Sequence, residues 1–179
     1  MLDIDNCALI VVDVQGKLAQ LMYEKELLFK NIQILIKAAK ILNIPILWCQ
    51  QVPKTLGPTI PELTELLKDN EPIDKSSFSC YRDENFKSKL QNLNKEQFII
   101  CGIETHICIY QTAKDLFDNG LNVNVISDAV SSRILANKQV ALNRLAAEGI
   151  TISSIEMVLF ELLKTAKHPN FREIAKLIK

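Results

Sequence analysis

The feature that most constrains the fold is an almost unbroken apolar segment near the start of the chain, CALIVVDV at residues 7–14. Val and Ile dominate the segment, and it lacks the polar–apolar alternation of a strand with one face in water. A strand of this kind is buried on both faces, as occurs mainly in parallel sheets covered by helices on both sides. It also carries one carboxylate, Asp13, close to its end.

Helical and strand-like patterns alternate along the rest of the chain. Apolar residues at helical spacing predict a long helix over 24–42, and QFIIC predicts a strand at 97–101. We expect further strands at 46–49, 72–74, 121–126 and 150–153, and further helices at 62–68, 83–90, 105–119, 136–148, 155–163 and 170–178. No repeat or linker divides the chain, so residues 1–179 are predicted to form a single domain. We predict a three-layer α/β/α Rossmann-like fold, with about six parallel strands and helices on both faces of the sheet.

Composition and charge exclude several classes of partner. The 21 basic residues balance the 21 acidic ones, so the chain has no electrostatic footprint for nucleic acid or an anionic membrane. No apolar run approaches the roughly 20 residues that span a bilayer, and the first ten residues carry acids where a signal peptide carries bases. We therefore expect a soluble, cytoplasmic protein that binds neither nucleic acid nor membrane.

Five cysteines are scattered along the chain without CxxC or His-rich spacing, which predicts neither a disulfide framework nor a zinc site. Cys7 and Cys101 fall within predicted strands and Cys49 at the end of one, so these three are expected in the core or beside a pocket. Cys80 is expected to be exposed in a loop. Cys108 follows a strand, at the start of a predicted helix.

In open α/β sheets, ligands bind at the carboxyl ends of the strands, and three side chains are predicted to meet there: Asp13, Lys75 and Cys108. Each has an ordinary alternative: Asp13 could cap a helix or loop, Lys75 could be a solvated surface residue, and Cys108 could be a small core residue. Together they form a nucleophile, a base and an orienting charge. If Thr105 caps the following helix, Cys108 lies in its first turn, where free N–H groups favour a thiolate and can bind an oxyanion.

Three stretches carry a family resemblance: ALIVVDVQ at 8–15, DKSSFS at 74–79 and CGIETHICIYQTA at 101–113. On these residues the chain resembles the isochorismatase-like cysteine hydrolases, and the resemblance covers nearly its whole length. The resemblance implies a catalytic triad of Asp13, Lys75 and Cys108. It also implies a non-proline cis peptide bond between Ile103 and Glu104, and an oxyanion hole formed by the backbone N–H groups of Glu104 and Cys108.

Within this family, QQVPKTLGPTIPEL at 50–63, DAVSSR at 128–133 and LFELLKTAKHPNFREI at 159–174 are most similar to the isochorismatase domain-containing branch. The Asp-x-His metal motif of nicotinamidases is absent, since CQQVP occupies 49–53. The resemblance thus implies metal-independent and cofactor-independent hydrolysis of a small amide or related C–N bond, through a thioester. Candidate pocket residues are Gln50, Gln51, Phe78 and His106, with Trp48 and Tyr81 beside them.

Two other functions are compatible with parts of this pattern. A non-catalytic, oligomeric binding or scaffold protein could retain the triad geometry. A receiver-like signalling domain also has Asp and Lys at strand ends, but this chain lacks the acidic pair at the first strand, and that function leaves Cys108 unexplained. The resemblance further implies a homo-oligomer, a dimer or tetramer, and the apolar helix at 157–163 either contributes to its interface or completes the core.

Overall fold

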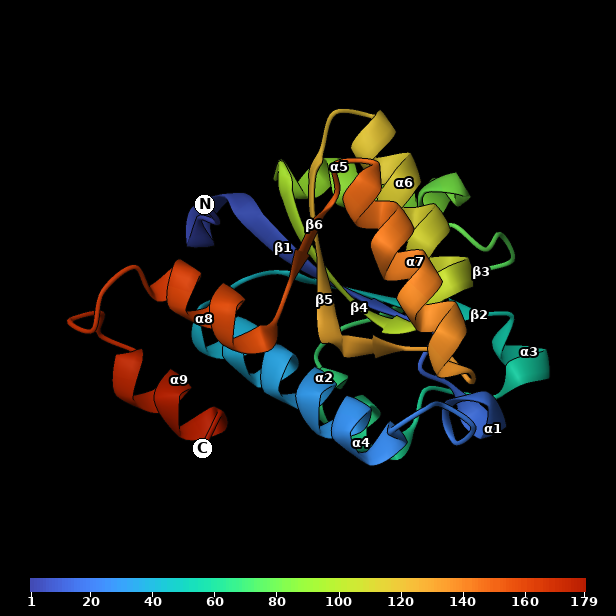
Figure 1. Ribbon diagram of the computed structural model, residues 1–179, viewed down its shortest axis with the longest axis horizontal. Coiled ribbons are helices and arrows are strands. Elements are labelled where there is room, and N and C mark those ends of the chain that lie inside the picture. The colour runs from blue at the N-terminus through green and yellow to red at the C-terminus, as the bar shows by residue number, and fades with distance from the viewer.

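A computed structural model describes residues 1–179, and it confirms the predicted α/β fold. Six strands form one parallel sheet in the order β3-β2-β1-β4-β5-β6 (Figure 1). The strands are β1 (Cys7–Val12), β2 (Ile46–Gln51), β3 (Pro72–Lys75), β4 (Gln97–Ile103), β5 (Asn122–Ser131) and β6 (Thr151–Ser153). The first strand thus lies inside the sheet, and all six of its residues are buried, as its composition predicts.

Helices cover both faces of the sheet. The α-helices are α1 (Gly16–Ala19), α2 (Lys25–Ile41), α3 (Pro53–Leu56), α4 (Pro61–Leu67), α5 (Glu84–Leu93), α6 (Tyr110–Asp118), α7 (Leu135–Ala147), α8 (Ile155–Leu163) and α9 (Phe171–Leu177). Helices α2, α4, α8 and α9 pack into a core cluster with Leu9 and Val11 of β1. Helices α5, α6 and α7 pack into a second cluster with Ala8, Ile10 and Val12. Successive residues of one strand therefore serve the two cores alternately.

The main departures from the predicted elements occur at the carboxyl end of the sheet. A single helix was expected over 105–119, but the chain first forms a π-helical turn, η3 (Thr105–Ile109), and α6 follows it. The strand expected to end at 126 continues to Ser131, after an irregularity that shifts its pairing with β4. After this bulge, residues 128–133 lie beside the end of β4 and beside η3. Local sequence patterns do not encode this contact.

The neighbouring strands β1 and β4 approach closely at Gly102. Its φ is +124°, and a Cβ atom placed there would lie 2.1 Å from the carbonyl oxygen of Val12. Only glycine fits this position without moving one of the two strands. The end of β1 and the segment after β4 are thereby held side by side.

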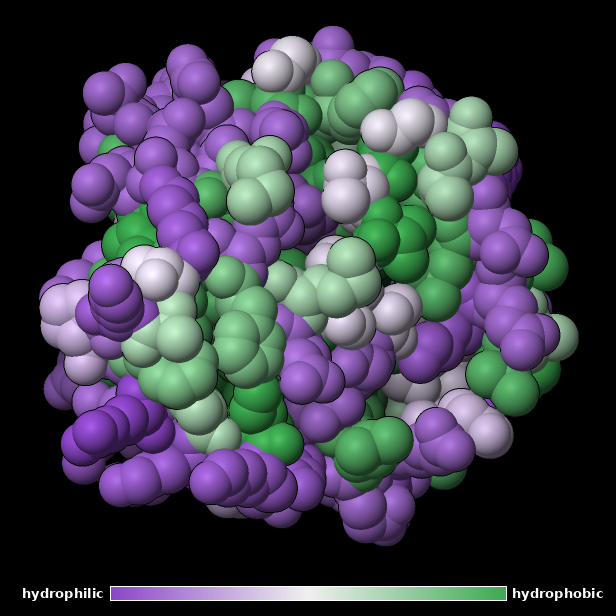
Figure 2. Space-filling model, turned by 60° about the vertical axis from the view of Figure 1, so that its left-hand side comes forward, coloured by the Kyte–Doolittle hydropathy of each residue, from purple (hydrophilic) through white to green (hydrophobic).

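Helix α8 completes the core with one face and leaves part of the other exposed. Val158, Leu159 and Leu162 are buried, whereas Met157 and Phe160 are 63% and 42% exposed. On the face shown in Figure 2, hydrophobic residues lie in patches among hydrophilic ones. None of the helices has the length and apolar character needed to cross a bilayer.

Candidate active site

The candidate active site lies at the point where the chain changes direction across the sheet. Crossovers from β1 proceed through β2 to β3 on one side, and the chain then returns to β4 on the other side of β1. Asp13 directly follows β1, Lys75 is the last residue of β3, and Cys108 lies in η3 after β4. Such a switch point forms a crevice at the carboxyl ends of the strands, as the sequence predicts.

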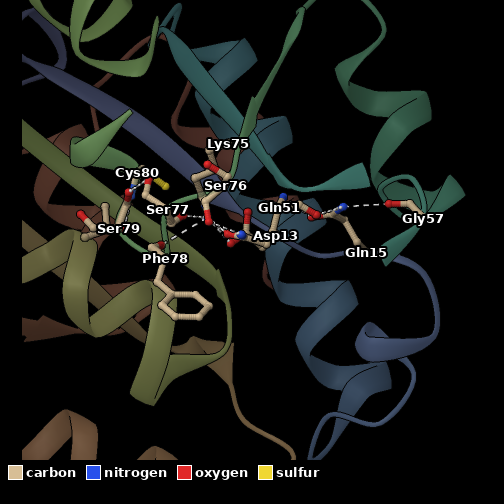
Figure 3. A network of polar contacts seen from close by, with 11 residues as sticks. Asp13, Gln15, Gln51, Gly57, Lys75, Ser76, Ser77, Phe78, Ser79 and Cys80 are labelled. Atoms are coloured by element: carbon tan, nitrogen blue, oxygen red, sulfur yellow. Dashed lines mark hydrogen bonds and ion pairs between the residues drawn. The ribbon is translucent and has the colours of Figure 1, made fainter. Parts of the chain in front are cut away.

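Lys75 is held by four oxygen atoms. Its Nζ lies 2.6 Å from Asp13 Oδ2 and 2.6 Å from Gln51 Oε1, and 3.2 Å from the carbonyl oxygens of Ser77 and Phe78 (Figure 3). Burial lowers the pKa of this ammonium, but the acidic groups of Cys80, Asp13 and Cys108 outweigh burial and leave the pKa raised. Lys75 is therefore a fixed positive charge at the base of the site, rather than the solvated surface residue of the alternative interpretation.

Asp13 is 3% exposed and stands in the left-handed region, with a φ of 53°. Burial raises the pKa of its carboxyl group, and Lys75 and the Cys108 thiol partly offset that effect. Oδ2 accepts a hydrogen bond from Lys75 Nζ, whereas the buried Oδ1 has no hydrogen-bond partner of standard geometry. This oxygen is the free acceptor in the site.

Cys108 is 7% exposed, and its thiol interacts with the Asp13 carboxylate. Burial and the negative charge of Asp13 raise the pKa of this thiol well above its usual value, although Lys75 opposes them. These effects outweigh the helix start that was expected to favour a thiolate. That expectation depended on a Thr105 helix cap, but the segment is a π-turn and the Thr105 hydroxyl is buried without a partner. The thiol needs a base, and Asp13 is next to it.

Glu104 connects β4 to η3. The peptide bond between Ile103 and Glu104 is cis, at the position that the family resemblance implies. The Glu104 N–H donates to no protein acceptor, so it is available to an oxygen atom in the pocket. The Glu104 carboxylate is committed elsewhere, because its Oε1 accepts hydrogen bonds of 3.1 Å from both the backbone N–H and Nε of Arg133.

A pocket of about 380 Å³ opens beside these groups. Its lining comprises Asp13, Leu18, Gln51, Leu56, Phe78, Ile103, Glu104, Ile107 and Cys108. Of the candidate pocket residues, Gln51 and Phe78 are therefore part of the lining, and Gln50 and His106 are not. Of the three residues of the expected triad, Asp13 and Cys108 line the pocket directly, while Lys75 lies behind them, bound to Asp13.

The side chains of Gln50 and His106 form hydrogen bonds outside the pocket. Alternate residues of a strand face opposite sides of the sheet, and Gln50 Nε2 donates to Thr59 Oγ1 at 2.9 Å, away from Lys75. The same hydroxyl accepts a 2.8 Å hydrogen bond from Trp48 Nε1. His106 Nδ1 lies 2.9 Å from Ser132 Oγ, since the extension of β5 occupies that side of η3.

The other cysteines are all buried and unpaired by disulfides. The expectation that Cys80 is exposed is wrong: it is fully buried, because its backbone N–H is bound to Thr112 Oγ1 at 2.9 Å and its side chain packs beside Cys49. Neither thiol lines the pocket. No three His, Cys, Asp or Glu side chains are grouped so that they could hold a metal ion.

Gln15 supports the site but was not singled out from the sequence. Its carboxamide pairs with the backbone of Gln51: Oε1 accepts the Gln51 N–H at 2.6 Å, and Nε2 donates to the Gln51 carbonyl at 3.1 Å. Nε2 also donates to the Gly57 carbonyl at 2.7 Å (Figure 3). The signal in the sequence was an amide side chain two residues after Asp13, directly after an apolar strand, where it would have indicated a residue that supports the site.

Comparison with known proteins identifies the relatives of this chain. A family model described as the isochorismatase domain matches residues 7–157. Isochorismatase domain-containing protein 2 of the zebrafish Danio rerio is 42% identical over 172 residues, which are 95% of this chain and 85% of that protein.

Solved structures share the fold over almost the entire chain. A structure described as MAR1 ribonuclease from Caenorhabditis elegans is 37% identical, with a TM-score of 0.92, covering 99% of this chain and 91% of that one. The YcaC gene product of Escherichia coli, described as an octameric hydrolase of unknown specificity, has a TM-score of 0.88 at 24% identity, over 98% of this chain and 94% of that one. The second likeness concerns the fold alone.

Proposed function

The chain belongs to the isochorismatase family, and we propose that it hydrolyses a small amide or a related C–N bond, with Cys108 as nucleophile. One observation carries this proposal: the Cys108 thiol and the unpartnered Oδ1 of Asp13 share one pocket, with the Lys75 ammonium bound to the same carboxylate. A nucleophile, a base and an orienting charge are the minimal parts of covalent acyl transfer.

In the proposed reaction, Asp13 takes the proton of the Cys108 thiol as the sulfur attacks the substrate carbonyl carbon. The carbonyl oxygen becomes an oxyanion, which accepts hydrogen bonds from the backbone N–H groups of Glu104 and Cys108. When the C–N bond breaks, Asp13 returns the proton to the leaving nitrogen, and an acyl thioester remains on Cys108. Water then attacks the thioester, giving up a proton to Asp13, and the carboxylic acid leaves as the thiol is restored.

Lys75 contributes charge rather than a proton in this proposal. Its ammonium fixes one oxygen of Asp13, which directs the free oxygen toward Cys108. The positive charge also compensates for the negative charge that moves from sulfur to the substrate oxygen, and in a buried site such compensation is strong. No cofactor takes part.

The test is a hydrolysis panel of small amides and ureido compounds, run with the wild-type protein and with Cys108→Ala. Turnover should fall by at least about 10²-fold in the variant, since the covalent route is removed. Cys80→Ala is the matched control, because Cys80 is a buried thiol that does not line the pocket. It should retain turnover. Full activity of Cys108→Ala on an identified substrate would falsify the covalent mechanism.

The panel should also include an RNA oligonucleotide, because the C. elegans relative is described as a ribonuclease. RNA cleavage that survives Cys108→Ala would place the activity elsewhere on the protein. The competing proposal, a scaffold that keeps the triad without using it, predicts no turnover and uniform, slow alkylation of all five thiols. Selective alkylation of Cys108 contradicts it.

The proposed biological unit is a homo-oligomer. Helix α8 completes the core with one face, and its Met157 and Phe160 side chains present apolar surface on the other. The E. coli neighbour is described as octameric. Light scattering coupled to gel filtration tests this directly, and a mass near 20.2 kDa at micromolar concentration would contradict it.

A further inference from the structure

The walls of the pocket are mostly apolar. Leu18, Leu56, Phe78, Ile103 and Ile107 surround the reacting groups, and they come from α1, α3, the loop after β3, the end of β4 and η3. Phe78 is 55% exposed although it lines the pocket, so it lies at the mouth. An apolar acyl group gains free energy by leaving water for such a wall, whereas a charged group loses its hydration there.

None of the residues that line the pocket is a lysine or an arginine, and the Lys75 ammonium behind them is paired within the protein. An ammonium has three N–H donors, and Lys75 has four oxygens around it, including those of Asp13 and Gln51. Arg133 donates both Nε and its backbone N–H to Glu104, whose side chain is 5% exposed. Lys75 cannot bind an acidic substrate without giving up a buried partner, and Arg133, whose side chain is 53% exposed, does not line the pocket.

The charged side chains in the lining of the pocket, Asp13 and Glu104, are both acidic. The Asp13 carboxyl group lies beside the Cys108 thiol, and its buried Oδ1 accepts no hydrogen bond of standard geometry. A substrate carboxylate would have to enter next to this oxygen, in surroundings that screen charge poorly. Like charges brought together in this way disfavour binding strongly.

We propose that the pocket selects small, uncharged substrates with an apolar acyl group and excludes substrates that carry a carboxylate. As a statement about substrate class, the inference rests on the proposed amide hydrolysis. The selection itself is a property of the pocket around Cys108, so it can be measured without any turnover.

The primary test compares the alkylation of Cys108 by iodoacetamide and by iodoacetate, two reagents of the same size that differ in charge. Peptide mass spectrometry measures the rate at Cys108, and 2-mercaptoethanol supplies the reference ratio for a free thiol. The ratio of the two rates cancels the ionised fraction of the thiol. We expect the preference of Cys108 for the neutral reagent to exceed the reference by at least about tenfold. An equal or reversed preference would overturn the inference.

A pair of variants tests the source of the selection. In Glu104→Gln, the backbone N–H stays in place, but Arg133 loses its anionic partner, so the preference for the neutral reagent should fall about threefold or more. The matched control is Glu148→Gln, which breaks an ion pair with Arg144 outside the pocket and should leave the ratio unchanged. An unchanged ratio in Glu104→Gln would show that ion pairing does not set the selection.

Turnover separates this inference from the proposed function. The substrate pair is 4-methylpentanamide and succinamate, in which an isopropyl group and a carboxylate of similar shape stand at the same distance from the amide. Hydrolysis of both at equal rates would support the amidase and refute the selection. A strong alkylation preference without turnover of any amide would support the selection and refute the amidase.

Discussion

The buried ion pair between Asp13 and Lys75 gives the most direct physical test of the site. Nζ and Oδ2 lie 2.6 Å apart, and the two side chains are 4% and 0% exposed. Removing one member of such a pair leaves the other charge buried without compensation, which costs about 3–5 kcal/mol. Asp13→Asn and Lys75→Met should therefore each lower the free energy of unfolding by about that amount.

The double variant Asp13→Asn/Lys75→Met should be much less destabilised than the sum of the two single variants. Both charges are gone, so the remaining cost comes from neutral groups such as Gln51 Oε1, which loses its donor. We expect a loss of about 3 kcal/mol where the sum predicts at least about 6 kcal/mol, and hence a coupling energy near 3 kcal/mol.

Equilibrium unfolding in urea, followed by circular dichroism and by tryptophan fluorescence, measures all four proteins. Lys40 and Asp69 form the matched control, since their ion pair of 3.0 Å lies at the surface with exposures of 36% and 76%. Its coupling should lie within about 0.5 kcal/mol of zero. Additive losses at Asp13 and Lys75 would refute the picture of a desolvated, mutually dependent pair.

Three further predictions concern the pH response, the support of the site and the fold. Because burial raises the pKa of Cys108 and a thiol ionises as pH rises, its alkylation rate should still be increasing at pH 9; a plateau below pH 8 would contradict this. Gln51→Ala should speed the same alkylation several-fold, because an ammonium that loses one acceptor can stabilise the thiolate more strongly, whereas Gln50→Ala, which removes a hydrogen bond to Thr59, should leave the rate unchanged. Gly102→Ala should lower the midpoint of urea unfolding far more than Gly120→Ala, where an added Cβ meets nothing within 4 Å; equal effects would leave backbone strain as the common cause.

The architecture follows from patterns that short segments of the sequence carry. The buried strand at 7–12, the helical spacing over 24–42 and the alternation of the two element types all report local burial. The strand ends in turn placed Asp13, Lys75 and Cys108 at one edge of the sheet. This is possible because all strands of a parallel sheet end on the same side.

Side-chain partners depend on contacts between distant segments, and the sequence alone did not determine them. Cys80 was expected in a loop at the surface, yet it is buried by a contact with Thr112, 32 positions away. The tendency toward a thiolate that a helix start gives Cys108 is likewise outweighed, because burial and the neighbouring Asp13 carboxylate raise the pKa of its thiol.

By itself, the sequence determined the fold class and the placement of Asp13, Lys75 and Cys108 at one edge of the sheet, because hydrophobic periodicity and strand ends are local properties. Only the tertiary structure decided which glutamine faces Lys75, which groups line the pocket, and which charges remain unpaired there. Those outcomes depend on the exact pairing of β2 with β3 and on the bulge in β5. A shift of one residue in a strand reverses every side chain that it carries, so the lining of the pocket is fixed only when the whole sheet has assembled.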